Sequence, residues 1–241
     1  MEHWENLKPG GFRFVWTEGL FRPGTDTFLL SSLPRLKPGL RLCDLGCGTG
    51  LLGLLLLQRE AEMFVTGVEI QPEAVRLAEE AVRENGLQDR FTVRLEDLRK
   101  TALPAGSFDL AVCNPPYYPP QSGCTAADAA RRTARSETAC TLSDVCRTAA
   151  RLVRWGGAFC LVHKPERLTD LLCTLRGTGW EPKRLRFVSR TPEAAPSLLL
   201  AEARRGGKPG LTIEPPLFLQ TMDGKPSPEL ERIYFRQEAP L

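Results

Sequence analysis

The stretch LRLCDLGCGTGLLGLLLLQRE, residues 40–60, joins three kinds of segment in direct succession. The apolar run Leu40–Leu45 predicts a strand, the glycines at 46, 48 and 50 predict a tight turn, and Thr49–Glu60 predicts a helix. Parallel strands need a crossover between them, and a strand that turns through glycines into a helix is how such a crossover begins. This stretch therefore predicts an α/β fold built on a parallel sheet.

Strand-like and helix-like segments continue to alternate after this unit. Further strands are predicted at 63–70, 90–98, 107–113 and 158–163, and helices at 72–86, 143–157 and 165–180. We expect Gly156 and Gly157 to end the second of these helices, and 182–190 and 197–205 to form a closing strand pair. The alternation predicts a Rossmann-like, doubly wound sheet of seven mostly parallel strands in a three-layer α/β/α arrangement. Many different enzymes share this pattern, so it does not choose among them.

Three breaks interrupt the alternation: the first two dozen residues, the segment 118–137 and the tail from residue 206. We expect residues 1–24 to be an N-terminal extension and 25–205 to be the main domain. The tail, 206–241, is expected to pack on that domain.

The composition excludes several classes of protein. With 42% hydrophobic and 25% charged residues it is typical of a globular chain. No apolar run approaches the about 18 residues that a membrane span requires. The N-terminus, MEHWENLKPGG, lacks the basic and then apolar layout of a signal peptide, so we expect a cytoplasmic protein.

Eight cysteines and two histidines show neither a C-x-x-C pair nor the spacing of zinc ligands. We therefore expect reduced, buried thiols and no bound metal. The formal net charge of +3 permits binding to nucleic acid without establishing it.

Acidic residues stand where three predicted strands end. Asp44 precedes the turn made by Gly46, Gly48 and Gly50, Glu69 ends the next strand, and Asp97 the one after. The turn lacks the Lys-Ser/Thr of a phosphate-binding loop, so it suits a ligand with little phosphate. A carboxylate about 20 residues beyond the turn can accept from ribose hydroxyls, and Asp97 can accept from an adenine amino group. Taken singly, the turn and Glu69 also have ordinary structural explanations, but together they predict a pocket for S-adenosylmethionine.

The motif NPPYY, residues 114–118, follows the apolar run Phe108–Cys113. Two prolines end a strand and fix the backbone. Asn114 Oδ1 and the Pro115 carbonyl can then accept the two hydrogens of a flat amino group, which is preorganised electrostatic stabilisation. The ring of Tyr117 can stack on a base. The alternative is a polyproline-type turn whose tyrosines pack on a neighbouring loop.

The series DLGCGTG, VEI, LEDL and NPPYY resembles the class I S-adenosylmethionine-dependent methyltransferases that act on amino groups. The flanking segments, GFRFVWTEGLFRPGTDTFLLSSL, the region after the motif and LTIEPPLFLQTMDGKPSPELERIYF in the tail, resemble the bacterial valine tRNA adenine N6-methyltransferases. The resemblance extends over nearly the whole chain. It implies methylation of an adenine N6 beside the anticodon of a valine tRNA.

The resemblance also implies roles for particular residues. The implied catalytic residues are Asn114, Pro115, Pro116 and Tyr117. The implied residues around S-adenosylmethionine are Thr25, Asp26, Asp44, Gly46, Gly48, Gly50, Glu69, Ile70, Asp97 and Asn114.

Substrate RNA is expected to meet the segment after the motif, and the protein is expected to be a monomer. The residues predicted to contact RNA are Tyr118, Arg131, Arg132 and Arg135, and more arginines follow in the closing strands. Two other substrates remain open. RPGTD (22–26) is close to a segment of release-factor glutamine methyltransferases, whose substrate also presents a planar amide, and guanine N2-methylation of ribosomal RNA uses a similar tetrapeptide.

Overall fold

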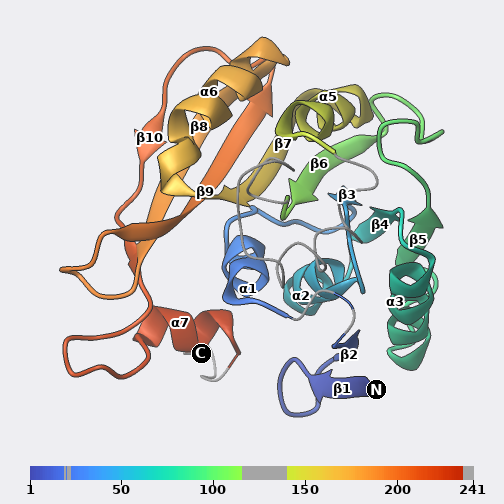
Figure 1. Cartoon of the computed structure of the whole chain (residues 1–241). Coiled ribbons are helices and arrows are strands. Elements are labelled where there is room, and N and C mark those ends of the chain that lie inside the picture. The colour runs from blue at the N-terminus through green and yellow to red at the C-terminus, as the bar shows by residue number, and fades with distance from the viewer. Residues whose placement is uncertain (19, 21–22, 116–139, 236–241) are drawn as a thin grey trace, which may run out of the picture.

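The computed structural model describes residues 1–18, 20, 23–115 and 140–235. Its centre is a nine-stranded sheet in the order β10-β8-β9-β7-β6-β3-β4-β5, with β11 also paired to β8 (Figure 1). The described strands of this sheet are β3 (Arg41–Leu45), β4 (Phe64–Glu69), β5 (Phe91–Leu95), β6 (Phe108–Cys113), β7 (Val153–His163), β8 (Trp180–Ser189), β9 (Pro196–Arg205), β10 (Thr212–Ile213) and β11 (Leu217–Phe218). Neighbouring strands are parallel except at β9, which is antiparallel to β7 and β8.

The predicted α/β class and mostly parallel sheet are confirmed. The seven long strands are the seven predicted from sequence, and β10 and β11 add two residues each at β8. Segments this short carry no periodic signal, so only their pairing with β8 makes them strands.

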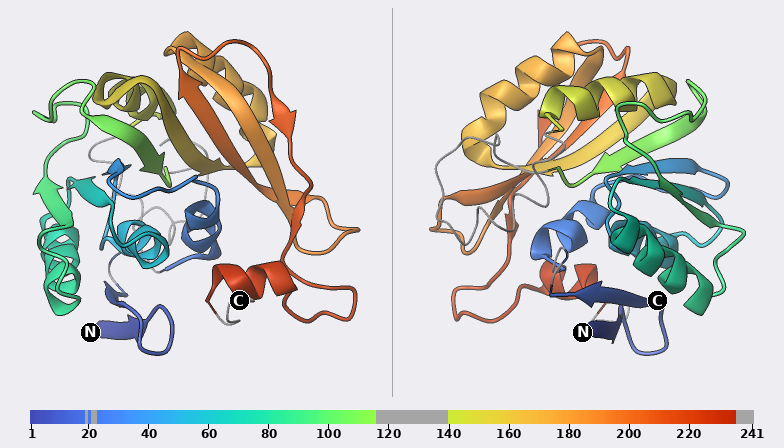
Figure 2. Two further views of the ribbon diagram at one scale, coloured as in Figure 1. Left: turned by 180° about the vertical axis from the view of Figure 1, so that it is seen from behind. Right: turned by 45° about the vertical axis from the view of Figure 1, so that its right-hand side comes forward.

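Helices cover both faces of the sheet, which confirms the three-layer arrangement (Figure 2). The described helices are α1 (Thr25–Ser32), α2 (Leu51–Arg59), α3 (Pro72–Glu84), α5 (Leu142–Leu152), the short η1 (Pro165–Arg167), α6 (Leu168–Gly177) and α7 (Pro228–Ile233). Side chains of α1, α2 and α3 belong to one core cluster, and those of α5 and α6 to another. Adjacent strand residues divide between the clusters: Leu42 joins the first and Cys43 the second. Strands buried on both faces therefore appear in the sequence as continuous apolar runs.

The boundary between α5 and β7 differs from the prediction. The helix ends at Leu152, and β7 already begins at Val153, so the expected helix through residue 157 is wrong. Gly156 (φ +75°) lies where the β6–β7 register shifts between Phe108 and Leu110. A Cβ on Gly157 would meet the Asp109 carbonyl oxygen at 2.7 Å. The glycine pair therefore serves an irregular strand with a close backbone approach, a role that resembles a helix stop in sequence.

Both ends of the described chain pack on the main body. Strands β1 (Glu2–Asn6) and β2 (Arg13–Thr17) form an antiparallel hairpin, which the sequence did not predict. Arg13 pairs with Glu84 of α3 at 2.5 Å. At the other end, Tyr234 stacks on Phe28 of α1, with ring centroids 4.2 Å apart. The division at residues 24 and 205 stays a prediction.

The burial expected for the cysteines holds for most of those that the structure describes, but not for Cys173, which is exposed. All seven that the structure describes are free, and five of them are buried. Cys124 lies outside the described residues. Among the helices of the described chain, none combines the length and apolar character needed to cross a membrane.

Replacing Gly157 by Ala should destabilise the protein by about 1–3 kcal/mol, since the added methyl group meets backbone at both Asp109 and Arg154. Chemical denaturation measures the difference. Gly177→Ala is the matched control, because a Cβ there meets nothing within 4 Å at the end of α6, and it should be neutral or stabilising. Equal effects of the two substitutions would contradict the assigned close approach.

Candidate active site

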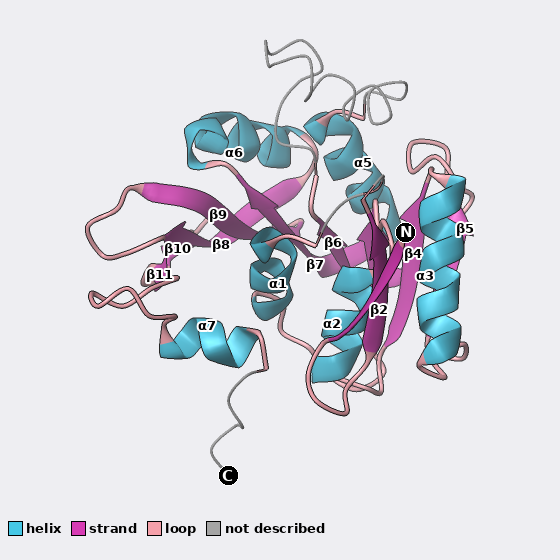
Figure 3. Ribbon diagram, turned by 60° about the horizontal axis from the view of Figure 1, so that its bottom comes forward, coloured by secondary structure: helices cyan, strands magenta, loops and turns pink. Residues whose placement is uncertain are grey.

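The topology brings the predicted functional segments to one edge of the sheet. Strands β6, β3, β4 and β5 are adjacent and parallel, so all four carboxyl ends face the same way (Figure 3). The glycine turn follows β3, Glu69 ends β4, Asp97 follows β5 and Asn114 follows β6. This is the edge at which open α/β sheets bind ligands.

The glycine turn is tied to the neighbouring strand by its backbone. Gly46, Gly48 and Gly50 all have positive φ, at 75°, 54° and 81°, which explains the G-x-G-x-G spacing. The amides of Gly46 and Cys47 donate to the Val68 carbonyl at 2.8 and 3.2 Å. Gly50 is the N-cap of α2, so the turn leads directly into the positive end of that helix.

Glu69 is buried and binds backbone on two sides. Its Oε2 accepts from the Gly48 amide at 3.0 Å, and its Oε1 accepts from the amides of Ile70 and Gln71 at 2.9 and 3.0 Å. The carboxylate therefore joins the glycine turn to the start of α3. Its predicted role at a ribose stays a prediction, and Ile70, with 38% of its surface exposed, lies directly beside it in the chain.

Asp44 is a buried carboxyl whose hydrogen-bonding capacity is only partly satisfied by the described residues. It is 1% exposed, and its Oδ2 has no hydrogen-bond partner among the described residues. Burial, and next the negative charge of Glu69, raise the pKa of Asp44 to about 8, while a backbone hydrogen bond from Gly53 opposes the shift. A buried carboxylate of this kind is a candidate partner for a ligand cation.

Asp97 is held by a neighbour two residues away. Its Oδ1 and Oδ2 accept from Arg99 Nε at 2.9 and 3.0 Å, and Oδ2 also accepts from Arg99 Nη2 at 2.6 Å. These bonds lower the pKa of Asp97, so it is ionised at neutral pH. Its predicted contact with an adenine amino group stays a prediction.

Asn114 makes a side-chain contact that the sequence did not predict. Its Nδ2 donates to Thr27 Oγ1 at 3.1 Å, across 87 residues of sequence. Thr27 is 5% exposed on α1, and the predicted Thr25 and Asp26 lie half-buried in the same first turn. Pro115 is buried, whereas Pro116, Tyr117, Tyr118, Arg131, Arg132 and Arg135 lie outside the described residues.

Residues 14–167 match the family model of the methyltransferase small domain. The chain belongs to this family. The tRNA1(Val) (adenine(37)-N6)-methyltransferase of Tolumonas auensis is 34% identical over 221 residues, which are 90% of this chain and 91% of that protein. The protein of the same name from Dickeya chrysanthemi is 31% identical, over 86% of this chain and 84% of its own length.

Solved methyltransferase structures share the fold. The crystal structure of a predicted O-methyltransferase from Agrobacterium tumefaciens aligns with a TM-score of 0.73 over 89% of this chain and 98% of that one, at 21% identity. A geranyl diphosphate methyltransferase in complex with SAM aligns with a TM-score of 0.55, at 20% identity, over 74% of this chain and 83% of that one. At these identities the likeness shows the fold alone.

The methyltransferase uses S-adenosylmethionine, which supplies an electrophilic methyl group on a sulfonium and carries a cationic amino group. The site fits such a ligand. Buried Asp44 Oδ2, which has no hydrogen-bond partner among the residues described, can accept from a cation, and the amides at the start of α2 can meet a carboxylate. We expect Asp44, the glycine turn, Glu69, Ile70 and Asp97 to line this ligand.

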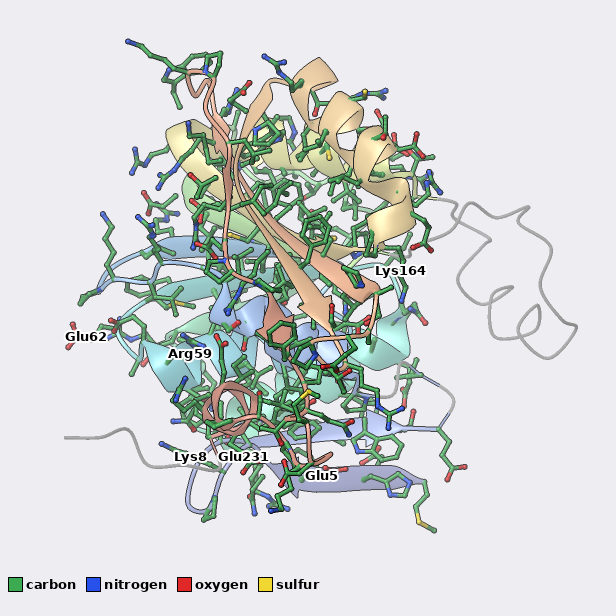
Figure 4. All side chains as sticks on the ribbon, turned by 90° about the vertical axis from the view of Figure 1, so that its left-hand side faces the viewer. Glu5, Lys8, Arg59, Glu62, Lys164 and Glu231 are labelled. Atoms are coloured by element: carbon green, nitrogen blue, oxygen red, sulfur yellow. The ribbon has the colours of Figure 1, made fainter. Side chains whose placement is uncertain are left out.

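His163 was not predicted to lie at this edge. It ends β7, next to β6, and is 2% exposed. Its Nδ1 accepts from the Lys164 amide at 2.9 Å, and burial lowers its pKa, so the imidazole is neutral at pH 7. Figure 4 shows Lys164 on the other side of the molecule from Arg59, which lies in the last turn of α2.

A cavity of about 630 Å³ lies at the Arg59 end of α2. It is lined by Ser32, Pro34, Leu36, Arg59, Glu60, Arg186, Glu229, Arg232, Ile233 and Phe235. Neither Asp44 nor Asn114 belongs to this lining, so the cavity is separate from the candidate active site.

The arginines of the closing strands mostly bind the protein itself. Arg184 pairs with Glu202 and Glu214, and Arg186 pairs with Glu229 at 2.6 Å. Arg205 donates to the Val153 carbonyl. These arginines join β8 and β9 to the tail and to β7. Because their charges are used within the protein, their number in these strands is weak support for an RNA-binding surface.

Replacing Asp44 by Asn should change the pH dependence of stability in the ligand-free protein. A carboxyl whose folded pKa is raised from 3.8 to about 8 binds its proton in the folded state, so its stabilising contribution is lost as pH rises toward 8. Asn cannot ionise, so the variant should gain up to about 4 kcal/mol relative to wild type between pH 5 and pH 8. Thermal or urea unfolding at both pH values measures this.

The same variant should bind S-adenosylmethionine at least about tenfold more weakly by calorimetry, because a carboxyl that can ionise beside the ligand's amino group is replaced by an amide that cannot. A stability difference that stays constant with pH would contradict the buried acid assigned here.

Proposed function

We propose that the protein transfers a methyl group from S-adenosylmethionine to the exocyclic N6 amino group of adenine 37, beside the anticodon, in a valine tRNA. The observation that carries the proposal is the position of Asn114, at the carboxyl end of β6 beside the glycine turn of β3. The curated relatives that bear this activity in their names support the choice of substrate.

Methyl transfer to an adenine amino group requires hydrogen-bond acceptors rather than a strong general base. The lone pair of an adenine amino group is delocalised into the ring, so its nitrogen is a weak nucleophile. Two fixed acceptors can draw its hydrogens out of the ring plane and make the lone pair available, and Asn114 Oδ1 and the Pro115 carbonyl are suited to this. Asn114 is held by Thr27, and the proline ring fixes φ at Pro115. The proton becomes acidic only after the nitrogen has gained the methyl group.

The proposal also assigns contacts between the segment after Asn114 and the RNA substrate. Tyr117 would stack on the adenine, which is worth about 1–3 kcal/mol per base. Tyr118, Arg131, Arg132 and Arg135 would meet the neighbouring nucleotides and phosphates. An adenine in an anticodon loop is single-stranded, so little unstacking is needed to bring it to Asn114.

We further propose that the enzyme acts as a monomer in the cytoplasm and needs no metal. Among residues 1–18, 20, 23–115 and 140–235, no group of three or more His, Cys, Asp or Glu side chains could hold a metal ion. The reaction proposed here uses only neutral acceptors, a stacked ring and the bound methyl donor.

Nucleoside mass spectrometry of purified valine tRNA, with and without the gene, tests the proposal. Loss of N6-methyladenosine in the deletion strain, and its restoration by purified protein and S-adenosylmethionine, is the expected result. If release-factor glutamine or a ribosomal guanine takes the methyl group instead, while tRNA from the deletion strain takes none, the proposed substrate is wrong and one of the other planar-amino substrates is correct.

Replacing Asn114 by Ala should lower kcat about a hundredfold, a barrier change of about 2.7 kcal/mol, because one of the two acceptors is lost. Affinity for S-adenosylmethionine should stay within about twofold of wild type, since Asn114 acts mainly on the amino group. Single-turnover kinetics and calorimetry separate the two quantities. A parallel loss of cofactor binding would argue against the assigned role.

A further inference from the structure

The cavity at the Arg59 end of α2 has no part in the proposed methyl transfer. It lies between the last residues of α1 and α2, strand β8, and α7 of the tail. In Figure 4, Arg59 lies above α7, the helix that carries Glu231. The cavity volume of about 630 Å³ is within the range of about 300–1,000 Å³ in which proteins bind small molecules. The cavity is therefore large enough for a ligand of the size of a nucleotide.

Two arginines that line the cavity have guanidinium groups without a polar partner among the described residues. Arg59 is in the last turn of α2 and Arg232 is in the last turn of α7. Both are exposed, so a ligand can reach them from solvent. The negative end of a helix favours a cation, which accounts for each arginine taken singly. It does not account for two guanidinium groups, from different helices, that line the same cavity.

The other charged side chains of the lining already have partners. Arg186 donates to both carboxylate oxygens of Glu229, at 2.6 and 2.9 Å, so this pair cancels in charge. Glu60 Oε1 accepts from a backbone amide two residues further along the chain, at 3.0 Å. The two arginines without partners therefore outweigh the single remaining carboxylate. A concave site with surplus positive charge favours an anionic ligand.

The rest of the cavity wall is mainly apolar. Pro34, Leu36, Ile233 and Phe235 line it, and Ile233 belongs to the buried core. Lys8 Nζ lies 5.9 Å from the centroid of the Phe235 ring, which adds a further positive charge near this wall. The lining thus suits a molecule that has an anionic group at one end and an apolar or flat part at the other.

We infer that this cavity binds a small phosphate ester, whose phosphate is held by Arg59 and Arg232 and whose organic part lies against Leu36 and Phe235. A phosphate monoester carries about −1.5 to −2 charges at pH 7, which matches two guanidinium groups better than the single charge of a carboxylate does. The planar fork of arginine also fits phosphate oxygens. The site lies outside the methyl-transfer centre, and the inference does not depend on the proposed function.

Calorimetric titration with UMP tests this binding. The full-length protein is kept saturated with S-adenosylhomocysteine, so that the cofactor pocket is filled. We expect one UMP site with a Kd at or below about 1 mM, which weakens as salt is added because exposed charges are screened. Uridine, which has the same base and sugar without the phosphate, should not bind at the same concentrations. If UMP fails to bind, or if uridine binds equally well, the inference is overturned.

Two substitutions locate the UMP site. Arg59→Gln and Arg232→Gln should each weaken UMP binding at least about fivefold, because each removes a charge-assisted partner of the phosphate. Arg83→Gln is the matched control, since Arg83 is an exposed arginine in the last turn of α3 whose side chain also lacks a partner among the described residues. The control should bind UMP as wild type does. Unchanged UMP affinity in the two cavity variants, or an equal loss in the control, contradicts the inference.

A kinetic measurement separates a free phosphate ester from a phosphate of the RNA backbone. A concave cavity with apolar walls favours the free molecule, so the double variant of Arg59→Gln and Arg232→Gln should lose UMP binding and keep the wild-type KM for tRNA. A KM for tRNA that rises together with the loss of UMP binding would overturn the small-molecule occupant in favour of RNA. The UMP titration requires no methyl transfer, so the inference and the proposed function can fail separately.

Discussion

The buried Glu69 carboxylate accepts hydrogen bonds from three backbone amides, and the geometry of the candidate site depends on this cluster. One oxygen holds the amide of Gly48 in the glycine turn, and the other holds the amides of Ile70 and Gln71 at the start of α3. Charge-assisted bonds of this kind are among the stronger ones in proteins, and a helix N-terminus favours negative charge. The carboxylate thereby fixes the glycine turn relative to β4 before any ligand arrives.

The cluster has a consequence for the neighbouring acid. Glu69 is compensated by three amides, whereas Asp44 is buried near it with one oxygen that lacks a partner in the described part of the chain. Burial and the nearby charge of Glu69 raise the pKa of Asp44, and a perturbed buried acid of this kind is common in enzyme sites. A ligand cation beside Asp44 would stabilise its charged form and supply the missing partner. The ligand-free site is therefore less stable than it would be with an uncharged residue there, and it binds the cation more tightly.

The chain's sequence predicts most of the fold and much of the site. Apolar runs at β3, β4, β6 and β7 and the amphipathic α3 follow from periodicity alone. The glycine turn, the acidic strand ends and Asn114 follow from residue types at strand ends, and the topology places all of them at one edge. The wrong prediction concerns one boundary between a helix and a strand. At Gly156 and Gly157 the glycines suggested the end of a helix, because a bulged strand and a helix stop use the same residue for different reasons.

The sequence by itself determined the class of sheet, the edge proposed to bind the ligand and the residue types offered there. These depend on patterns within a few neighbouring residues, which local physical rules can interpret. The tertiary structure alone decided that Thr27 contacts Asn114 across 87 residues and that Arg184 pairs with Glu202 and Glu214. It also decided that one oxygen of buried Asp44 has no hydrogen-bond partner within the described part of the chain. Such contacts depend on how α1, the closing strands and the glycine turn pack against one another, and no local pattern in the chain records that packing.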